Sequence, residues 1–136
     1  MSEISGIETK RQEAGSIVQQ FICRAPKKNH EALVQLAKEF TDMFRNQGGM
    51  RIEYFRLSNT DDVSDFTNMA KTVPSSKSAE EEEIWIEQTF FRDSKQKDEH
   101  IAKCISAQNV DRLYKQFISL ITPGSAIMDE FNRIIV

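Results

Sequence analysis

Hydrophobic residues recur along much of the chain at the spacings that distinguish helices from strands. Between Lys27 and Gln47 they return every three or four positions, which predicts an amphipathic helix with one buried stripe. The stripe consists of Leu33, Leu36, Ala37, Phe40, Met43 and Phe44. Asn29 is a suitable N-cap for this helix, and Gly48-Gly49 is expected to end it.

Four further segments, 16–25, 50–57, 83–91 and 126–135, are rich in β-branched and aromatic residues and are predicted to be strands. In the first segment, apolar side chains fall on both alternating faces, with Phe21 on one face and Ile22 on the other. A strand of this kind is expected to be covered on both sides. Helical spacing returns between residues 94 and 121, with a predicted break at Asn109.

The predicted order is β-α-β-β-α-(α)-β, which is typical of a ferredoxin-like α+β fold. This fold is an antiparallel four-stranded sheet with helices on one face. Since the helices leave the other face bare, we expect a second copy of the chain to cover it, sheet against sheet. Residues 15–136 would form this single domain. Residues 1–14 are polar, lack periodicity and are expected to be a flexible tail.

A long polar segment, residues 58–82, joins the second and third predicted strands, with a short helical turn expected within 66–73. Two interpretations are open. The segment is either a lid over a small-molecule pocket or a fixed excursion. In the second case Phe66, Met69 and Val73 would pack on a dimer partner.

Charge and composition exclude several classes of protein. The 136 residues include 18 basic and 21 acidic ones, a balance that does not suit nucleic-acid binding. The acidic run Glu80–Glu83 is expected to be solvated. No apolar run approaches the roughly 20 residues of a membrane span, and the N-terminus resembles no signal peptide. We therefore expect a cytoplasmic protein with neither a membrane nor a nucleic acid as partner.

The motifs for metal and cofactor chemistry are sparse. His100 and Cys104 are four residues apart and would share one face of a helix. No second pair with ligand spacing accompanies them, so we predict no metal site and no cofactor. The other thiol, Cys23, is expected to be a buried core residue.

Carboxylates inside apolar strands are the remaining candidates for acid–base chemistry. A buried carboxylate costs free energy unless it is paired, so each is either a functional group or half of an ion pair with a nearby arginine. The candidates for a pocket are Gln20, Glu53, Trp85, Glu87 and Asp129. Periodicity alone does not say which strand face would line a barrel.

Several short motifs resemble the YbaA-like domain of unknown function, a family of the dimeric α+β barrel superfamily. They are the run 16–29 (SIVQQFICRAPKKN), the triplet 61–63 (DDV), and the triplet 84–86 (IWI) followed by 92–95 (RDSK). The resemblance extends over residues 15–133. The chain departs from the family at 68–70, where NMA replaces Ser-Phe-Pro, and at 129–131, where DEF replaces Gly-Gly-Phe. The resemblance implies the fold and a homodimer, but no activity.

Three functional hypotheses follow. The first is a homodimeric binding or assembly module without catalysis, suggested by the lack of a defined catalytic constellation. The alternative is a cofactor-independent enzyme, monooxygenase-like or isomerase-like, acting on a small organic substrate in the barrel pocket. Antibiotic biosynthesis monooxygenases of the same superfamily are the precedent. The third is a ligand-sensing module. An enclosed cavity that receives Glu53, Glu87 or Asp129 would favour the enzyme, whereas a pocket filled by side chains would favour the binding module.

Overall fold

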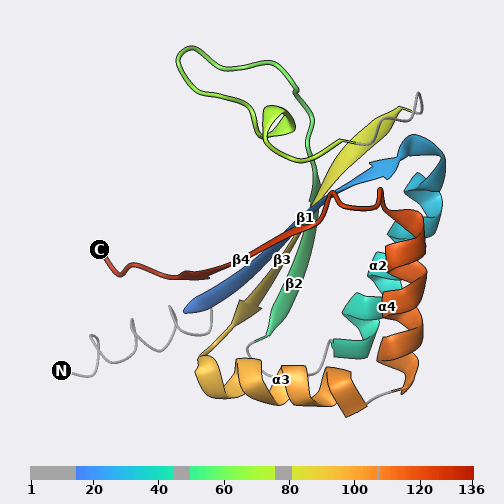
Figure 1. Cartoon of the computed structure of the whole chain (residues 1–136). Coiled ribbons are helices and arrows are strands. Elements are labelled where there is room, and N and C mark those ends of the chain that lie inside the picture. Colours follow the sequence, from blue (N-terminus) through green and yellow to red (C-terminus); the bar gives the residue numbers. More distant parts are fainter. Residues whose placement is uncertain (1–14, 45–49, 76–80, 107) are drawn as a thin grey trace.

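Four antiparallel strands form one sheet in the order β2-β3-β1-β4 in the computed structural model, which describes residues 15–44, 50–75, 81–106 and 108–136. The strands are β1 (Ile17–Pro26), β2 (Arg51–Arg56), β3 (Glu82–Phe91) and β4 (Ile127–Asn132). The two central strands, β1 and β3, are paired along their whole length (Figure 1). The predicted tail, residues 1–14, lies outside the described residues.

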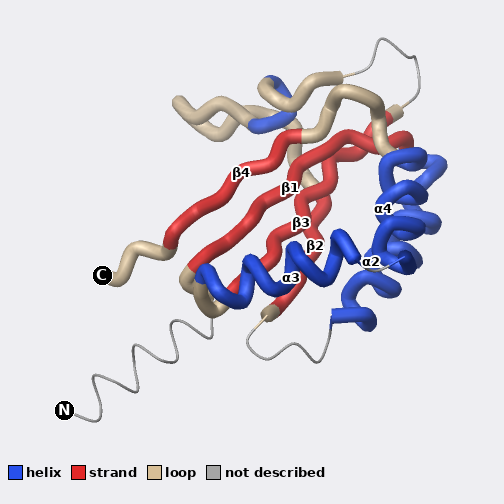
Figure 2. The backbone as a smooth tube through the Cα atoms, turned by 60° about the horizontal axis from the view of Figure 1, so that its bottom comes forward, coloured by secondary structure: helices blue, strands red, loops and turns tan. Residues whose placement is uncertain are grey.

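Three α-helices lie together on one side of this sheet: α2 (His30–Phe44), α3 (Ser94–Ser106) and α4 (Gln108–Leu120). Helices α2 and α4 lie side by side against the sheet, and α3 crosses its lower end (Figures 1 and 2). Two short 3-10 turns, Lys27–Asn29 and Met69–Lys71, complete the elements of the described residues. The strand order and the position of the helices confirm the predicted ferredoxin-like α+β fold. No helix in the described part of the chain is long and apolar enough to cross a membrane.

Local interactions explain where the helices begin and end. Helix α2 starts at His30, after the 3-10 turn, and the side-chain amide of Asn29 donates to the carbonyl of Leu120 at the end of α4 (2.8 Å). Helix α3 is capped by Asp93, whose carboxylate accepts from the Gln96 N–H (2.8 Å). The boundary between α3 and α4 lies close to the predicted break at Asn109.

The final strand is shorter than predicted. It ends at Asn132 rather than near residue 135, because it pairs only with β1, whose first residue, Ile17, is the partner of Asn132. Beyond that pair the Arg133 N–H donates to the Ser16 carbonyl (2.8 Å), and the Arg133 side-chain Nε–H donates to the Gly15 carbonyl (2.6 Å). The apolar residues 134–136 are exposed.

Strand pairing determines which side chains face the helices. Phe21, Glu87 and Tyr54 are direct cross-strand partners and lie on the helix side, whereas their neighbours Gln20 and Gln88 lie on the opposite side. We call the side without helices the outer face.

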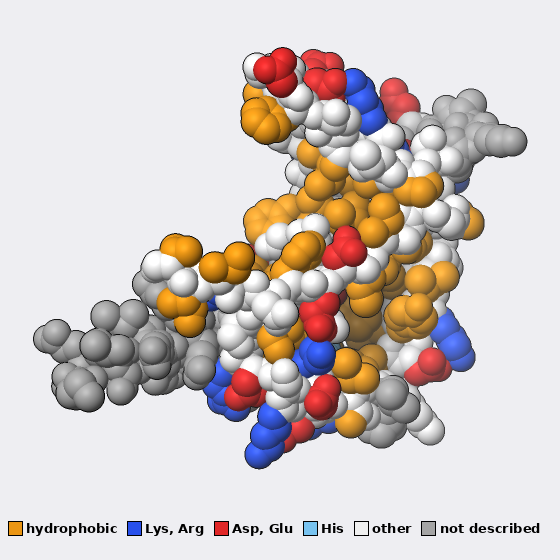
Figure 3. All heavy atoms as spheres, turned by 60° about the vertical axis from the view of Figure 1, so that its left-hand side comes forward, with side chains coloured by type: hydrophobic (Ala, Val, Ile, Leu, Met, Phe, Trp, Pro, Cys, Tyr) orange, Lys and Arg blue, Asp and Glu red, His pale blue; other side chains and the backbone are white. Residues whose placement is uncertain are grey.

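Part of the outer face is covered by the chain itself. Val73 is buried against Ile22 and Ile84, with Met69 and Ala70 packed beside them. The rest of this face stays open, and Figure 3 shows hydrophobic side chains gathered on it below the projecting segment 57–75. Its exposed members include Phe55 and Phe131. Met69 and Val73 therefore pack on the sheet of their own chain and not on a dimer partner, which corrects that expectation and leaves only the rest of the face for a second copy.

Candidate functional site

A cavity of about 350 Å³ lies between the helix side of the sheet and the three helices. Its lining is mostly aromatic and aliphatic, with a few polar side chains. The exposed lining residues Ile101, Asp111, Tyr114 and Met128 place its opening between α3, α4 and β4. A concave apolar site with few polar groups is the usual form of a small-molecule site.

The floor of the cavity is one row of side chains across the sheet. Tyr54 of β2 is opposite Glu87 of β3, Glu87 is opposite Phe21 of β1, and Phe21 is opposite Met128 of β4. All four residues line the cavity. Each strand thus contributes one residue, and the carboxylate has an aromatic residue on either side.

Glu87 is the charged group of this floor. It lines the cavity and keeps some accessible surface, but its carboxyl group is desolvated, and this burial raises its pKa above the ordinary value of 4.5. The hydroxyls of Tyr54 and Thr89 approach the carboxylate and offset part of that shift. Glu87 forms no ion pair with any cation in the described part of the chain.

The Tyr54 hydroxyl is buried and meets no partner at full hydrogen-bond geometry among the described residues. Burial raises its pKa far above the ordinary value, and the negative charge of the neighbouring Glu87 raises it further. The phenol therefore stays protonated at every physiological pH. It is a hydrogen-bond donor that approaches the Glu87 carboxylate without full hydrogen-bond geometry.

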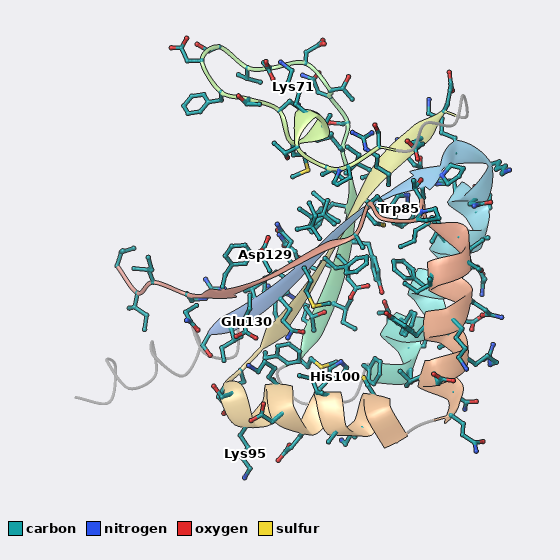
Figure 4. All side chains as sticks on the ribbon, in the orientation of Figure 1. Lys71, Trp85, Lys95, His100, Asp129 and Glu130 are labelled. Atoms are coloured by element: carbon teal, nitrogen blue, oxygen red, sulfur yellow. The ribbon has the colours of Figure 1, made fainter. Side chains whose placement is uncertain are left out.

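His100 and Cys104 form the end of the cavity next to α3 (Figure 4). The Cys104 sulfur lies 3.4 Å from Nε2 of His100, as the helical spacing predicts, while Nδ1 is buried with no partner among the described residues. Burial lowers the pKa of His100, with the Lys103 charge a smaller cause, so the ring is neutral at pH 7. Burial raises the pKa of the Cys104 thiol, and the charge of Glu87 adds to this. The described residues contain no third potential ligand that would complete a metal site with this pair.

A second hollow, an open groove of about 550 Å³, lies between α2 and β2. Trp85 lines it, and the Trp85 Nε1–H donates to Oε1 of Glu83 (2.7 Å). The same oxygen is 2.7 Å from Nδ1 of His30, and Arg56 lies 3.6 Å from the other oxygen. The expectation that Glu83 is solvated is wrong, because this network buries the carboxylate and ties the start of α2 to β3.

The structure divides the five sequence candidates between the two faces of the sheet. Trp85 and Glu87 lie on the helix side. Gln20, Glu53 and Asp129 lie on the outer face, in one cross-strand row with Gln88, as the register shows. The Gln88 amide donates to Gln20 (2.8 Å), and Glu53 pairs with Arg51 (3.2 Å). Of the five, Glu87 alone lines the cavity described above.

The segment 57–75 does not cover this cavity. Val73 and Met69 pack on the outer face, and Arg24 holds the segment there by donating to the carbonyls of Val73 (3.1 Å) and Ala70 (2.5 Å). The lid interpretation is therefore wrong for a cavity on the helix side. Within this segment Phe66 is largely exposed, at 76%.

Sequence reasoning did not assign Thr89, His100 and Cys104 to a pocket with Glu87. One signal in the sequence connects Thr89 with Glu87. Alternate residues of one strand share a face, and this face carries Trp85, Glu87, Thr89 and Phe91. No comparable signal brings His100 and Cys104 to Glu87, because that contact depends on how α3 crosses the sheet.

No protein-family model matches the chain, and neither does any curated protein sequence. The resemblance to the YbaA-like domain is therefore not confirmed. The chain is similar in structure to an antibiotic biosynthesis monooxygenase, with 11% identity, coverage of 88% of this chain and 99% of the other, and a TM-score of 0.49. It is also similar to SnoaB, a cofactor-independent oxygenase from Streptomyces nogalater (10% identity, 89% and 96% coverage, TM-score 0.49). A conserved protein from Methanosarcina mazei Go1 gives 9% identity, 92% and 99% coverage and a TM-score of 0.49.

Proposed function

We propose that the protein binds a small, largely apolar organic molecule in the cavity and that Glu87 exchanges a proton with it. One observation carries the proposal: Glu87 is a desolvated carboxylate without a cation partner among the described residues, on the floor of an apolar cavity. Such a group costs free energy unless a ligand uses it. The proposal favours a cofactor-independent enzyme over a binding module without catalysis.

The chemistry that suits these groups is proton abstraction next to a carbonyl. Burial makes Glu87 a stronger base than an ordinary carboxylate, because the raised pKa brings it closer to neutrality. The Tyr54 hydroxyl, which stays protonated, would donate to the oxygen on which negative charge develops. The reaction would be isomerase-like: Glu87 takes the proton from one carbon and returns it to another.

A homodimer is part of the same proposal. The open area of the outer face, with Phe55 and Phe131 exposed, supports the packing of a second sheet there. A distant relationship to the YbaA-like domain, suggested by the short motifs, agrees with this arrangement. The cavity opens on the helix side, so both copies would keep their sites accessible.

Hydrogen exchange at carbon provides the test. Phenylacetone in D2O exchanges its α-hydrogens slowly, and the exchange can be followed by proton NMR. We expect the wild-type protein to accelerate it by about 10²-fold, the lower range for general-base catalysis. Glu87→Gln should remove the acceleration, whereas Glu31→Gln, the same change at an exposed site on α2, should keep it. Equal rates with wild type and Glu87→Gln would refute the proposed role.

A further inference from the structure

The cavity is lined by acidic side chains and by no basic one among the described residues. Among the described residues that line it, the charged side chains are Glu87 and Asp111, and no lysine or arginine is present. Asp111 is paired with Lys115 on the surface of α4 (2.9 Å), so its charge is largely offset. His100 is neutral, as shown above. Glu87 therefore has no compensating positive charge in the described lining once it ionises.

Aromatic rings surround this charge. Six aromatic side chains are among the described residues that line the cavity: Phe21, Phe40, Phe44, Tyr54, Tyr114 and Phe117. Phe21 and Tyr54 are the cross-strand neighbours of Glu87, and Phe117 packs edge-on against Phe21 with ring centroids 5.3 Å apart. Ring faces attract cations through their quadrupole, and the attraction is stronger where water is excluded.

We infer that the molecule bound in this cavity is an organic cation, with an ammonium group lying against the Glu87 carboxylate and an apolar part among the aromatic rings. The inference rests on the proposed function, whose substrate class it names. An ammonium group would supply the partner that Glu87 lacks within the described chain. An anionic ligand would instead face an uncompensated carboxylate in a desolvated site.

The same cation would also change the protonation state of Glu87. A positive charge next to a carboxylate favours the ionised form and so lowers its pKa. A ligand that carries an ammonium group would therefore convert Glu87 into the basic form on binding, and binding would release a proton. A neutral ligand of the same shape would have no such effect.

Three ligands with one carbon skeleton test the inference: 2-phenylethylammonium, 2-phenylethanol and phenylacetate. Their affinities are measured by isothermal titration calorimetry at pH 7 with the full chain. We expect the cation to bind at least roughly tenfold more tightly than the alcohol, since a desolvated cation–π contact alone is worth this factor. The anion should bind more weakly than both. In Glu87→Gln the cation should lose its advantage while the alcohol keeps its affinity, and Glu31→Gln should behave as wild type.

A second measurement does not depend on a variant. Between pH 4.5, the ordinary glutamate pKa, and neutrality, calorimetry in buffers of different ionisation enthalpy should show proton release when the cation binds and none when the alcohol binds. Equal affinities of cation and alcohol for wild type, without proton release, would overturn the inference. If the alcohol nevertheless binds and the phenylacetone exchange still depends on Glu87, the proposed function stands although the inference fails. Absence of binding by all three ligands, together with no exchange, would overturn both.

Discussion

At the scale of single residues, Glu87 differs from the other strand carboxylates in what surrounds it. Glu53 has Arg51, Glu130 has Lys97 (3.0 Å) and Glu83 has a histidine, a tryptophan and an arginine. Glu87 has aromatic cross-strand neighbours and two hydroxyls instead. Its ionisation is therefore coupled to folding in a way that can be measured without any ligand.

The stability of the protein should fall as Glu87 ionises. The pKa of Glu87 is raised in the folded state, so the folded protein holds this proton more tightly than the unfolded chain does. That stabilisation is complete below the unfolded pKa, near 4.5, and is lost as the pH rises through the folded pKa. We expect Glu87→Gln to gain stability relative to wild type over that range and to reach a constant difference above it. Urea unfolding at a series of pH values measures the difference, and a difference independent of pH would contradict the burial of the charge.

Removal of the Tyr54 hydroxyl should cost little. The hydroxyl approaches the Glu87 carboxylate without full hydrogen-bond geometry, so Tyr54→Phe removes a buried polar group and at most a weak hydrogen bond. We expect the free energy of unfolding to change by at most about 1 kcal/mol. The phenylacetone exchange rate should fall in the same variant. A loss of stability well beyond this value would show that the hydroxyl is satisfied in solution.

The sequence predicted only part of this site, for a physical reason. Both faces of the strands carry apolar residues, so alternation within each strand neither says which face meets the helices nor gives the register that separates Glu87 from Gln20 and Glu53. The sequence alone therefore predicts one group of Glu53, Glu87 and Asp129, although these residues lie on two faces of the sheet. The missing information is the tertiary contact between the apolar stripes of the helices and one face of the sheet.

At the scale of elements, the helices and strands follow from local patterns, but the packing of the segment 57–75 does not. The buried positions of α2, Leu33, Leu36 and Phe44, belong to the predicted stripe, while Phe40 is only partly buried because it also lines the cavity. The segment instead depends on long-range contacts to Ile22 and Arg24 of β1. The polar composition of the segment does not predict these contacts, because the hydrogen bonds from Arg24 go to backbone carbonyls, which do not depend on the side chains of the segment.

Arg24 should therefore hold the segment in place. Arg24→Met keeps much of the aliphatic stem but removes both bonds to the segment, each worth about 1.5–3 kcal/mol as hydrogen bonds from a charged donor. We expect faster amide exchange within residues 58–75, measured by mass spectrometry. Arg112→Met, at an exposed site on α4, is the control. Ligand affinity in the cavity should not change, since the segment lies on the other face. If Arg24→Met also lost ligand affinity, the interpretation of the segment as a lid would be supported instead.

At the scale of the whole molecule, the outer face combines a polar row with apolar neighbours. The row of Glu53, Gln88, Gln20 and Asp129 crosses the middle of the sheet, and Phe55 and Phe131 lie on opposite sides of it along the strands. A second sheet packed here would bury both aromatic residues. The hydrogen bond between Gln88 and Gln20 already satisfies part of the row without a partner.

The proposed dimer should depend on the exposed aromatic residues of this face. We expect light scattering at micromolar concentration to give twice the chain mass of 15.7 kDa, with an interface of roughly 1,200–2,000 Å². The double variant Phe55→Glu and Phe131→Glu should be monomeric, because it places charges in the apolar part of the interface. The same changes on exposed apolar residues of α4, Tyr114 and Ile118, should leave the dimer intact. A wild-type monomer would refute the dimer.

The two thiols differ in environment, and this gives the cavity a chemical reporter. Cys104 lines the cavity, whereas Cys23 is packed behind Trp85 and has a pKa raised to about 12, mainly by burial. A maleimide should therefore label Cys104 first, and the chain contains no third cysteine to compete. Occupancy of the cavity would then appear as slower labelling, read directly from the protein mass. Ligands could be screened in this way before any reaction is known, with Cys104→Ser as the unlabelled reference.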